Sequence, residues 1–113
     1  MNRIELLNQL LQLTVWLPIE DYPNYEISIC GQVRNIKTKR VLKQCINRNG
    51  YYYVKLNRNN EKFKHQRIHR VVAKTFIPNL NNENFVDHID SNRLNNTVSN
   101  LRWVSSQQNN FNR

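Results

Sequence analysis

The chain has 113 residues, a hydrophobic fraction of 39% and a net charge of +9. This length allows one domain with a modest core, and the hydrophobic content argues against global disorder. The most apolar stretch, residues 6–17, is interrupted by polar side chains, so it is too short and too polar to span a bilayer. It also lacks the cleavage site of a signal peptide, and two cysteines cannot form a disulfide framework, so we expect a cytoplasmic protein.

The first half of the chain predicts one helix and several short strands. Apolar residues at helical spacing predict a helix over residues 4–13, which Trp16-Leu17-Pro18 ends. Strands then alternate with turn residues, and the turns are Cys30-Gly31 and Asn47-Arg48-Asn49-Gly50, where Asn-Gly favours a tight hairpin. The expected strands are residues 25–29, 32–36, 41–46, 51–56 and 61–68.

The second half changes in character. Residues 69–76 have helical spacing, and Pro78 stops the helix. Residues 85–89 and 101–104 predict two strands, and Ser105 or Ser106 can cap a final helix. We therefore predict a single α+β domain over residues 1–113, with an antiparallel β-meander followed by a chemically active C-terminal third.

The positive charge is concentrated in the middle of the chain. Residues 1–29 carry one basic and four acidic side chains, whereas residues 34–74 carry thirteen Lys or Arg and one acid. Such a segment repels itself unless a polyanion is nearby, which favours a nucleic acid as a partner over a merely solvated surface. An anionic membrane fits less well, because the basic residues do not share one amphipathic helix.

Strand alternation selects the side chains expected to contact DNA. Tyr52, Val54 and Leu56 share one face, and Tyr51, Tyr53 and Lys55 share the other. Tyrosines on a half-buried sheet can equally pack against cross-strand neighbours. The candidate contacts are Arg34, Lys43, Arg48, Tyr51, Tyr53, Lys55, Arg58, Lys62, Lys64 and Arg67.

Asp87-His88, followed by several asparagines, has the composition of a phosphodiesterase site. An imidazole is a natural general base near neutral pH, and a divalent cation can stabilise charge on a phosphate. Mg²⁺ prefers oxygen ligands and keeps several waters, so one carboxylate and one amide suffice from the protein. Asp87 can supply the carboxylate, and an asparagine of the final helix can supply the amide.

A zinc site is disfavoured. His65 and His69 are four residues apart, but Cys30 and Cys45 are fifteen apart, unlike the short cysteine spacing of zinc motifs. His69, at the start of a helix, is expected to act as a cap or a phosphate contact.

Separated sequence blocks resemble phage HNH homing endonucleases that carry an N-terminal nuclease-associated modular segment. The resemblance covers roughly residues 15–113. The blocks are Tyr25-Glu26-Ile27-Ser28, Gly31-Gln32-Val33-Arg34, His69-Arg70-Val71-Val72-Ala73-Lys74-Thr75-Phe76, Val86-Asp87-His88-Ile89-Asp90, Asn95-Asn96, Asn100-Leu101-Arg102-Trp103-Val104 and Asn109-Asn110.

The resemblance implies a C-terminal ββα-metal fold over residues 61–113, after a DNA-binding segment over residues 15–60. His88 then matches the general base, and Asp87 matches a ligand of one divalent cation, Mg²⁺ or Mn²⁺. Asn100 matches the residue that braces the loop and orients the histidine. Asn109 matches the second metal ligand, with Asn110 and Asn96 as rivals.

The implied reaction is hydrolysis of duplex DNA, by nicking or cleavage, to a 5′-phosphate and a 3′-hydroxyl. The alternative is a catalytically silent nucleic-acid-binding protein or regulator of the same ancestry. Relatives usually continue into a helical DNA-reading segment where this sequence stops, so we expect a protein partner or an oligomer to assist target recognition. The phage resemblance implies the cytoplasm of a bacterial host.

Overall fold

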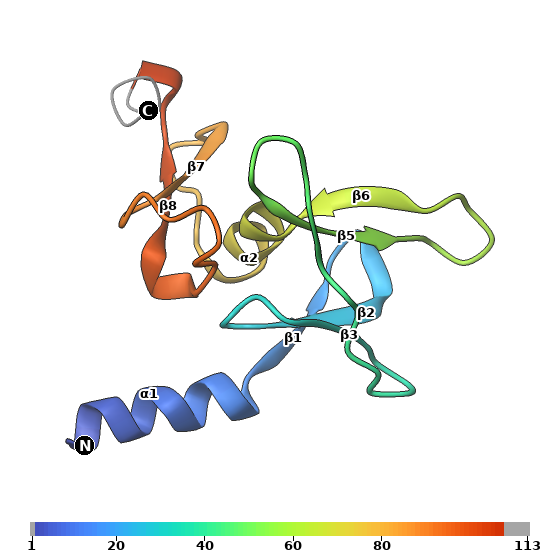
Figure 1. Ribbon diagram of the computed structural model, residues 1–113, viewed down its shortest axis with the longest axis horizontal. Coiled ribbons are helices and arrows are strands. Elements are labelled where there is room, and N and C mark those ends of the chain that lie inside the picture. Colours follow the sequence, from blue (N-terminus) through green and yellow to red (C-terminus); the bar gives the residue numbers. More distant parts are fainter. Residues whose placement is uncertain (1, 108–113) are drawn as a thin grey trace.

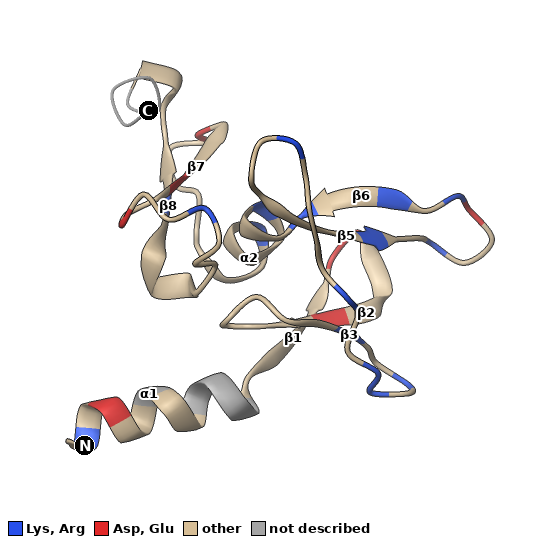
Figure 2. Cartoon of the chain, in the orientation of Figure 1, with Lys and Arg blue, Asp and Glu red and all other residues tan. Residues whose placement is uncertain are grey.

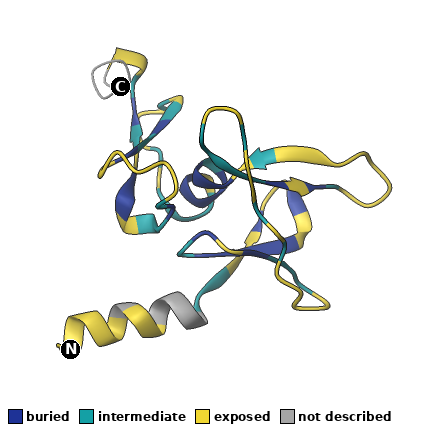
Figure 3. Cartoon of the chain, viewed as in Figure 1, coloured by how far each residue is buried: buried dark blue, intermediate teal, exposed yellow. Residues whose placement is uncertain are grey.

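The N-terminal half consists of one projecting helix and two small antiparallel sheets. The computed structural model describes residues 2–107, without the side chains of residues 8 and 11–14. Helix α1 (Arg3–Thr14) extends away from the rest of the chain (Figure 1), and its described side chains are exposed (Figure 3). The sheets contain β1 (Trp16–Ile19), β2 (Tyr22–Ser28) and β3 (Val33–Asn35), and then β4 (Cys45–Ile46), β5 (Tyr52–Leu56) and β6 (Lys64–Arg67).

The C-terminal half begins with a helix that follows β6 without a loop. Helix α2 (Ile68–Phe76) leads through a polar loop to β7 (Phe85–His88), which pairs with β8 (Leu101–Val104) after the short 3-10 helix η1 (Val98–Asn100). Residues 106 and 107 start a further helical turn, and the rest of the predicted final helix lies outside the described residues. None of the helices within residues 2–107 is long and apolar enough to cross a membrane.

Helix α2 lies at the centre of the molecule and contacts strands of all three sheets (Figure 1). Ile68, Val72 and Ala73 on this helix are fully buried. Val54 and Leu56 of β5 are buried against it, and Tyr52 is packed at the edge of the same core, as the strand alternation predicts. One hydrophobic cluster therefore joins both halves of the chain.

The predicted α+β class is confirmed, and the element boundaries differ in places. Residues 16–19 form a strand, although Trp16-Leu17-Pro18 predicted only the end of a helix. This strand is an edge strand, where a proline can be tolerated. The strand predicted over residues 41–46 contracts to Cys45–Ile46, and the one over 61–68 contracts to Lys64–Arg67.

Gly31 lies where the turn after β2 packs closely against α2 and the loop after β7. Its φ of +88° lies in the left-handed region, which favours glycine. A Cβ atom on this residue would lie 3.0 Å from Cγ2 of Ile68 and 3.1 Å from Cβ of Asn96. A side chain at this position would therefore push the N-terminal sheet away from α2 and from the loop after β7.

We expect Gly31→Ala to destabilise the protein by about 3 kcal/mol, from backbone strain and overpacking together. Gly50→Ala is the matched control, because Gly50 has a φ of +83° but only Cδ of Arg93 lies near its Cβ position, at 4.0 Å. This control should lose about 1–2 kcal/mol. Urea unfolding of both variants measures the difference, and equal losses would show that the close approach at Gly31 is unimportant.

Candidate active site

Strand β7 places Asp87 and His88 at the end of a two-stranded ribbon. Asp87 is paired with Arg102 across the ribbon, and His88 is paired with Leu101. Oδ2 of Asp87 accepts a hydrogen bond from Nε of Arg102 at 3.0 Å and forms a salt bridge with Nη2 of the same residue at 2.9 Å. The cross-strand pair thus holds the Asp87 carboxylate in place on the ribbon.

His88 is buried and held by a specific hydrogen bond. Its imidazole lies 2.8 Å, measured from Nε2, from Oδ1 of Asn96. An amide oxygen only accepts, so Nε2 carries the proton and donates it. In the neutral ring Nδ1 then holds a lone pair, which is the form that can act as a base.

Asn100 braces the loop of residues 89–100 but does not bond to His88. Its Oδ1 accepts from the Asp90 backbone N–H at 3.1 Å, and its Nδ2 donates to Oδ1 of Asp90 and to the Asn95 carbonyl. Hydrogen bonds from the side chain of Asn95, then from the backbone of Asn92 and from Asn100, lower the pKa of Asp90. In this structure the Asn100 side chain closes the loop, and the hydrogen bond to the His88 imidazole comes from Asn96.

A cleft of about 940 Å³ opens beside His88. Its walls come from the turn before β5, the end of β6, the start of α2, strand β7 with the residue before it, and the loop that follows β7. Arg93 reaches across from this loop, with its Nη1 donating to the Asn49 carbonyl and its guanidinium 4.9 Å from the centre of the Tyr51 ring. The lining residues are Asn49, Tyr51, Arg67, His69, Arg70, Asn84, Phe85, Val86, Asp87, His88, Ser91 and Arg93.

Two further rings lie beside His88 in this cleft. The rings of Tyr51 and His69 are stacked, with centroids 4.8 Å apart, and His69 lies 5.1 Å from His88. Burial, followed by the charges of His88, Arg67 and Arg70, lowers the pKa of His69 to about 3. His69 is therefore a neutral ring at physiological pH.

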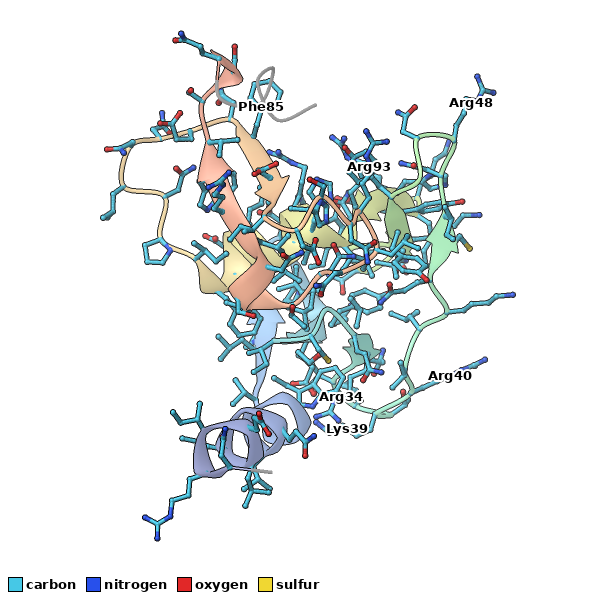
Figure 4. The ribbon with its side chains drawn as sticks, turned by 60° about the vertical axis from the view of Figure 1, so that its left-hand side comes forward. Arg34, Lys39, Arg40, Arg48, Phe85 and Arg93 are labelled. Carbon is cyan, nitrogen blue, oxygen red and sulfur yellow. The ribbon has the colours of Figure 1, made fainter. Side chains whose placement is uncertain are left out.

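The predicted DNA contacts divide into exposed and internally engaged side chains. Figure 2 shows basic residues along the β5–β6 hairpin and at the β4–β5 turn. Arg34 is engaged: its Nε lies 2.6 Å from Oε1 of Glu26, and its guanidinium covers the Trp16 ring. In Figure 4 Arg34 lies away from Arg93 and Arg48, on the side near α1.

Among the other candidates, Arg58 donates to the Asp21 carbonyl, and Tyr51 faces the cleft. The exposed remainder is Lys43, Arg48, Lys55, Lys62, Lys64 and Arg67, with Tyr53 half-buried.

One of the two predicted ligands of a hard divalent cation, Asp87, lies at the cleft among the described residues. Asp87 contributes one carboxylate with a 12% exposed side chain. The second predicted ligand, Asn109, and its rival Asn110 lie outside the described residues. Within residues 2–107 no group of three or more His, Cys, Asp or Glu is arranged to hold a metal. A single carboxylate with amide, water and phosphate oxygens is the ligand type that Mg²⁺ accepts, so the residues fit that ion.

Sequence reasoning missed the roles of four residues at the site. Asn96 was considered only as a rival metal ligand, and His69 only as a cap or phosphate contact. Arg93 and Asp90 were not singled out. The long-range contacts of these residues leave no local pattern, although the Asx-rich run after His88 could have indicated an ordered loop.

Both halves of the chain match known families. Residues 15–57 match the NUMOD4 motif, and residues 66–111 match the family described as HNH endonuclease. A solved structure described as DNA binding and cleavage by the HNH homing endonuclease I-HmuI superposes with a TM-score of 0.79 at 36% identity, covering 88% of this chain and 57% of the other.

Relatives with similar sequences come from viruses and phages. An uncharacterised HNH endonuclease, L245 of Acanthamoeba polyphaga mimivirus, is 44% identical over 86% of this chain and 29% of its own length. DNA endonuclease I-HmuI of Bacillus phage SP01 is 37% identical over 83% of this chain and 54% of its own length. The chain spans about half or less of the length of the curated relatives it matches.

The neutral state of His69 predicts an acid-dependent loss of stability. The unfolded chain protonates this imidazole below about pH 6.5, whereas the folded one does so only near pH 3, so stability falls as the pH drops through this window. Between pH 7 and pH 5 this group should cost about 2 kcal/mol. Urea unfolding at the two pH values should show that loss in the wild type and a smaller one in His69→Phe. His65→Phe, a control at an exposed position, should keep the wild-type loss; a full loss in His69→Phe would contradict the assignment.

Proposed function

The chain belongs to the HNH homing endonuclease family, and on that premise we propose that it is a metal-dependent DNA endonuclease with His88 as its general base. The observation that carries the proposal is the hydrogen bond between Nε2 of His88 and Oδ1 of Asn96, inside a cleft lined by three arginines. This bond fixes the tautomer in which Nδ1 can accept a proton from the attacking water.

The arginines of the cleft suit a phosphate substrate. Arg67 and Arg70 come from the end of β6 and the start of α2, and Arg93 comes from the loop after β7. Guanidinium groups bind phosphate oxygens in pairs and stabilise the charge that develops on them during hydrolysis. A reaction on a substrate without a phosphate group would not require three arginines beside one imidazole.

Asp87 and Asn109 are the proposed metal ligands. A bound Mg²⁺ or Mn²⁺ would act as a Lewis acid on the scissile phosphate and its leaving oxygen. Arg102 holds the carboxylate of Asp87 in place, with Asn100 bracing the loop that follows. The products would be a 5′-phosphate and a 3′-hydroxyl, made by nicking or cleaving duplex DNA.

The outward face of the β5–β6 hairpin is the proposed DNA-tracking surface. Tyr53 is paired with Arg67 on this face, and Lys55 follows at the next outward position. Arg67 also lines the cleft, so the surface leads directly to His88. Contacts of this kind position the phosphate backbone without reading its sequence.

Two broader assignments also stay proposals. We place the protein in the cytoplasm of a bacterial host, because named relatives are phage proteins. We also propose that a protein partner or a second copy of the chain contributes to recognition of the target site.

The nuclease proposal is tested with supercoiled plasmid and Mg²⁺ or Mn²⁺. Wild-type protein should convert the plasmid to nicked or linear DNA, and EDTA should abolish the reaction. His88→Ala should lower the rate at least about 100-fold, since a general base contributes that much or more. Arg3→Ala, on helix α1, which extends away from the cleft, should cut like wild type. Retention of DNA without cutting by any variant, under any metal, would favour a catalytically silent binding protein.

The tracking surface is tested by the salt dependence of DNA binding. Removing one phosphate contact should lower the slope of log K against log salt by about 1. We expect this change for Lys55→Ala, with a uniform loss of affinity across DNA sequences. Arg3→Ala is the control, because α1 projects away from the hairpin. Equal slopes for wild type and Lys55→Ala would remove Lys55 from the surface.

A further inference from the structure

Two tyrosine–histidine stacks lie close together in the sequence, and only one of them touches the proposed base. Tyr53 stacks on His65 at 4.4 Å on the outward face of β5–β6. Tyr51, two residues earlier, stacks on His69 at 4.8 Å and 18° inside the cleft. The ring of His88 lies 5.1 Å from His69 and 6.0 Å from Tyr51, so three rings form one cluster.

His69 reaches the cluster because it lies on the buried side of α2. It is only 5% exposed, among apolar neighbours such as Ile68 and Val72. An imidazole there gains little as a mere space-filler, since burial opposes its charged form. As a neutral ring it adds no charge beside His88 when His88 takes up a proton.

Tyr51 is held in the cluster from two directions. The preceding turn fixes its backbone: Oδ1 of Asn47 accepts from the Tyr51 N–H at 2.9 Å, and the Asn47 N–H donates to the Tyr51 carbonyl at 2.9 Å. The guanidinium of Arg93 covers its ring and ties the turn to the loop after β7 through the Asn49 carbonyl. A ring fixed on both sides can support a neighbouring ring.

We propose that Tyr51 and His69 are positioning residues that form a ring wall against the imidazole of His88. The hydrogen bond to Asn96 fixes one edge of that imidazole, but a single bond leaves the ring free to tilt about it. Ring contacts at 5–6 Å, in the range preferred by aromatic pairs, restrict the tilt. This inference rests on the proposed function, because it assigns the wall to the same reaction.

The ring wall is built from residues of both matched segments of the chain. Tyr51 belongs to the part of the chain that matches the NUMOD4 motif, and His69 and His88 belong to the part that matches the HNH endonuclease family. The N-terminal segment therefore supplies more than DNA affinity: its turn completes the surroundings of the base.

The test asks whether an aromatic ring is needed at positions 51 and 69 or whether any large apolar side chain suffices. Tyr51→Leu and His69→Leu remove a ring, whereas Tyr51→Phe and His69→Phe keep one. Misplacing a catalytic group by about 1 Å can cost about 100-fold, so the leucine variants should lose about 10- to 100-fold in single-turnover rate at saturating DNA. Their KM for DNA should change little, and the phenylalanine variants should retain most of the rate.

Trp16→Leu is the control, because it removes a half-buried ring on β1 that lies outside both the cleft and the proposed tracking surface. It should keep the wild-type single-turnover rate. A loss of rate in Tyr51→Phe equal to that in Tyr51→Leu would overturn the proposal, since the hydroxyl and not the ring would then matter. A loss confined to KM would overturn it as well, because Tyr51 would be a DNA contact only.

An NMR measurement on the free protein makes the two proposals separable. The ring-proton shifts of His88 should move in Tyr51→Leu, because the Tyr51 ring lies 6.0 Å from the His88 ring. They should stay in place in His65→Leu, because His65 stacks on Tyr53 outside the cleft. Unmoved shifts in Tyr51→Leu would refute the wall, even if the wild type cuts DNA. If the wild type fails to cut DNA, the proposed function is refuted. The His88 ring-proton shifts in Tyr51→Leu would still show whether the Tyr51 ring contacts His88.

Discussion

The structure depends on the burial of one short helix against three small sheets. Each sheet alone is too small to bury an apolar face, and α2 supplies the shared surface that lets them do so. The helix follows β6 without a loop, which fixes where its first turn lies. His69 in that turn meets Tyr51 from the N-terminal half and His88 from the C-terminal half. The packing that folds the chain therefore also assembles the cleft.

The loop of residues 89–100 is the second constraint, and it is built almost entirely from hydrogen bonds. Asp90 accepts from Asn92, Asn95 and Asn100, which closes the loop between the two strands. Asn96 can then reach back to Nε2 of His88 from a buried position under Gly31. An asparagine-rich sequence suits this arrangement, because amide side chains both donate and accept.

The sequence predicted the features that local chemistry determines. The Asn-Gly turn, the alternation of Tyr52, Val54 and Leu56, and the helix before Pro78 all follow from spacing and residue type. The strand over Trp16–Ile19 did not, because a proline argues against a strand unless the strand lies at an edge, and edge position is a property of the sheet. The choice of Asn96 over Asn100 as the partner of His88 depends on how the loop folds back, which spacing alone does not encode. The ring wall depends on contacts between residues 51, 69 and 88, and each residue alone has an ordinary structural explanation.

The central claim is that phosphodiester chemistry takes place in the cleft between His88 and the turn that carries Tyr51. A crystal structure of the protein with duplex DNA and Mn²⁺, with data collected at the manganese edge, tests it most directly. We expect an anomalous peak beside the Asp87 carboxylate and a backbone phosphate in the cleft, between His88 and Arg93. A manganese peak away from Asp87, with the DNA backbone outside the cleft, would contradict it.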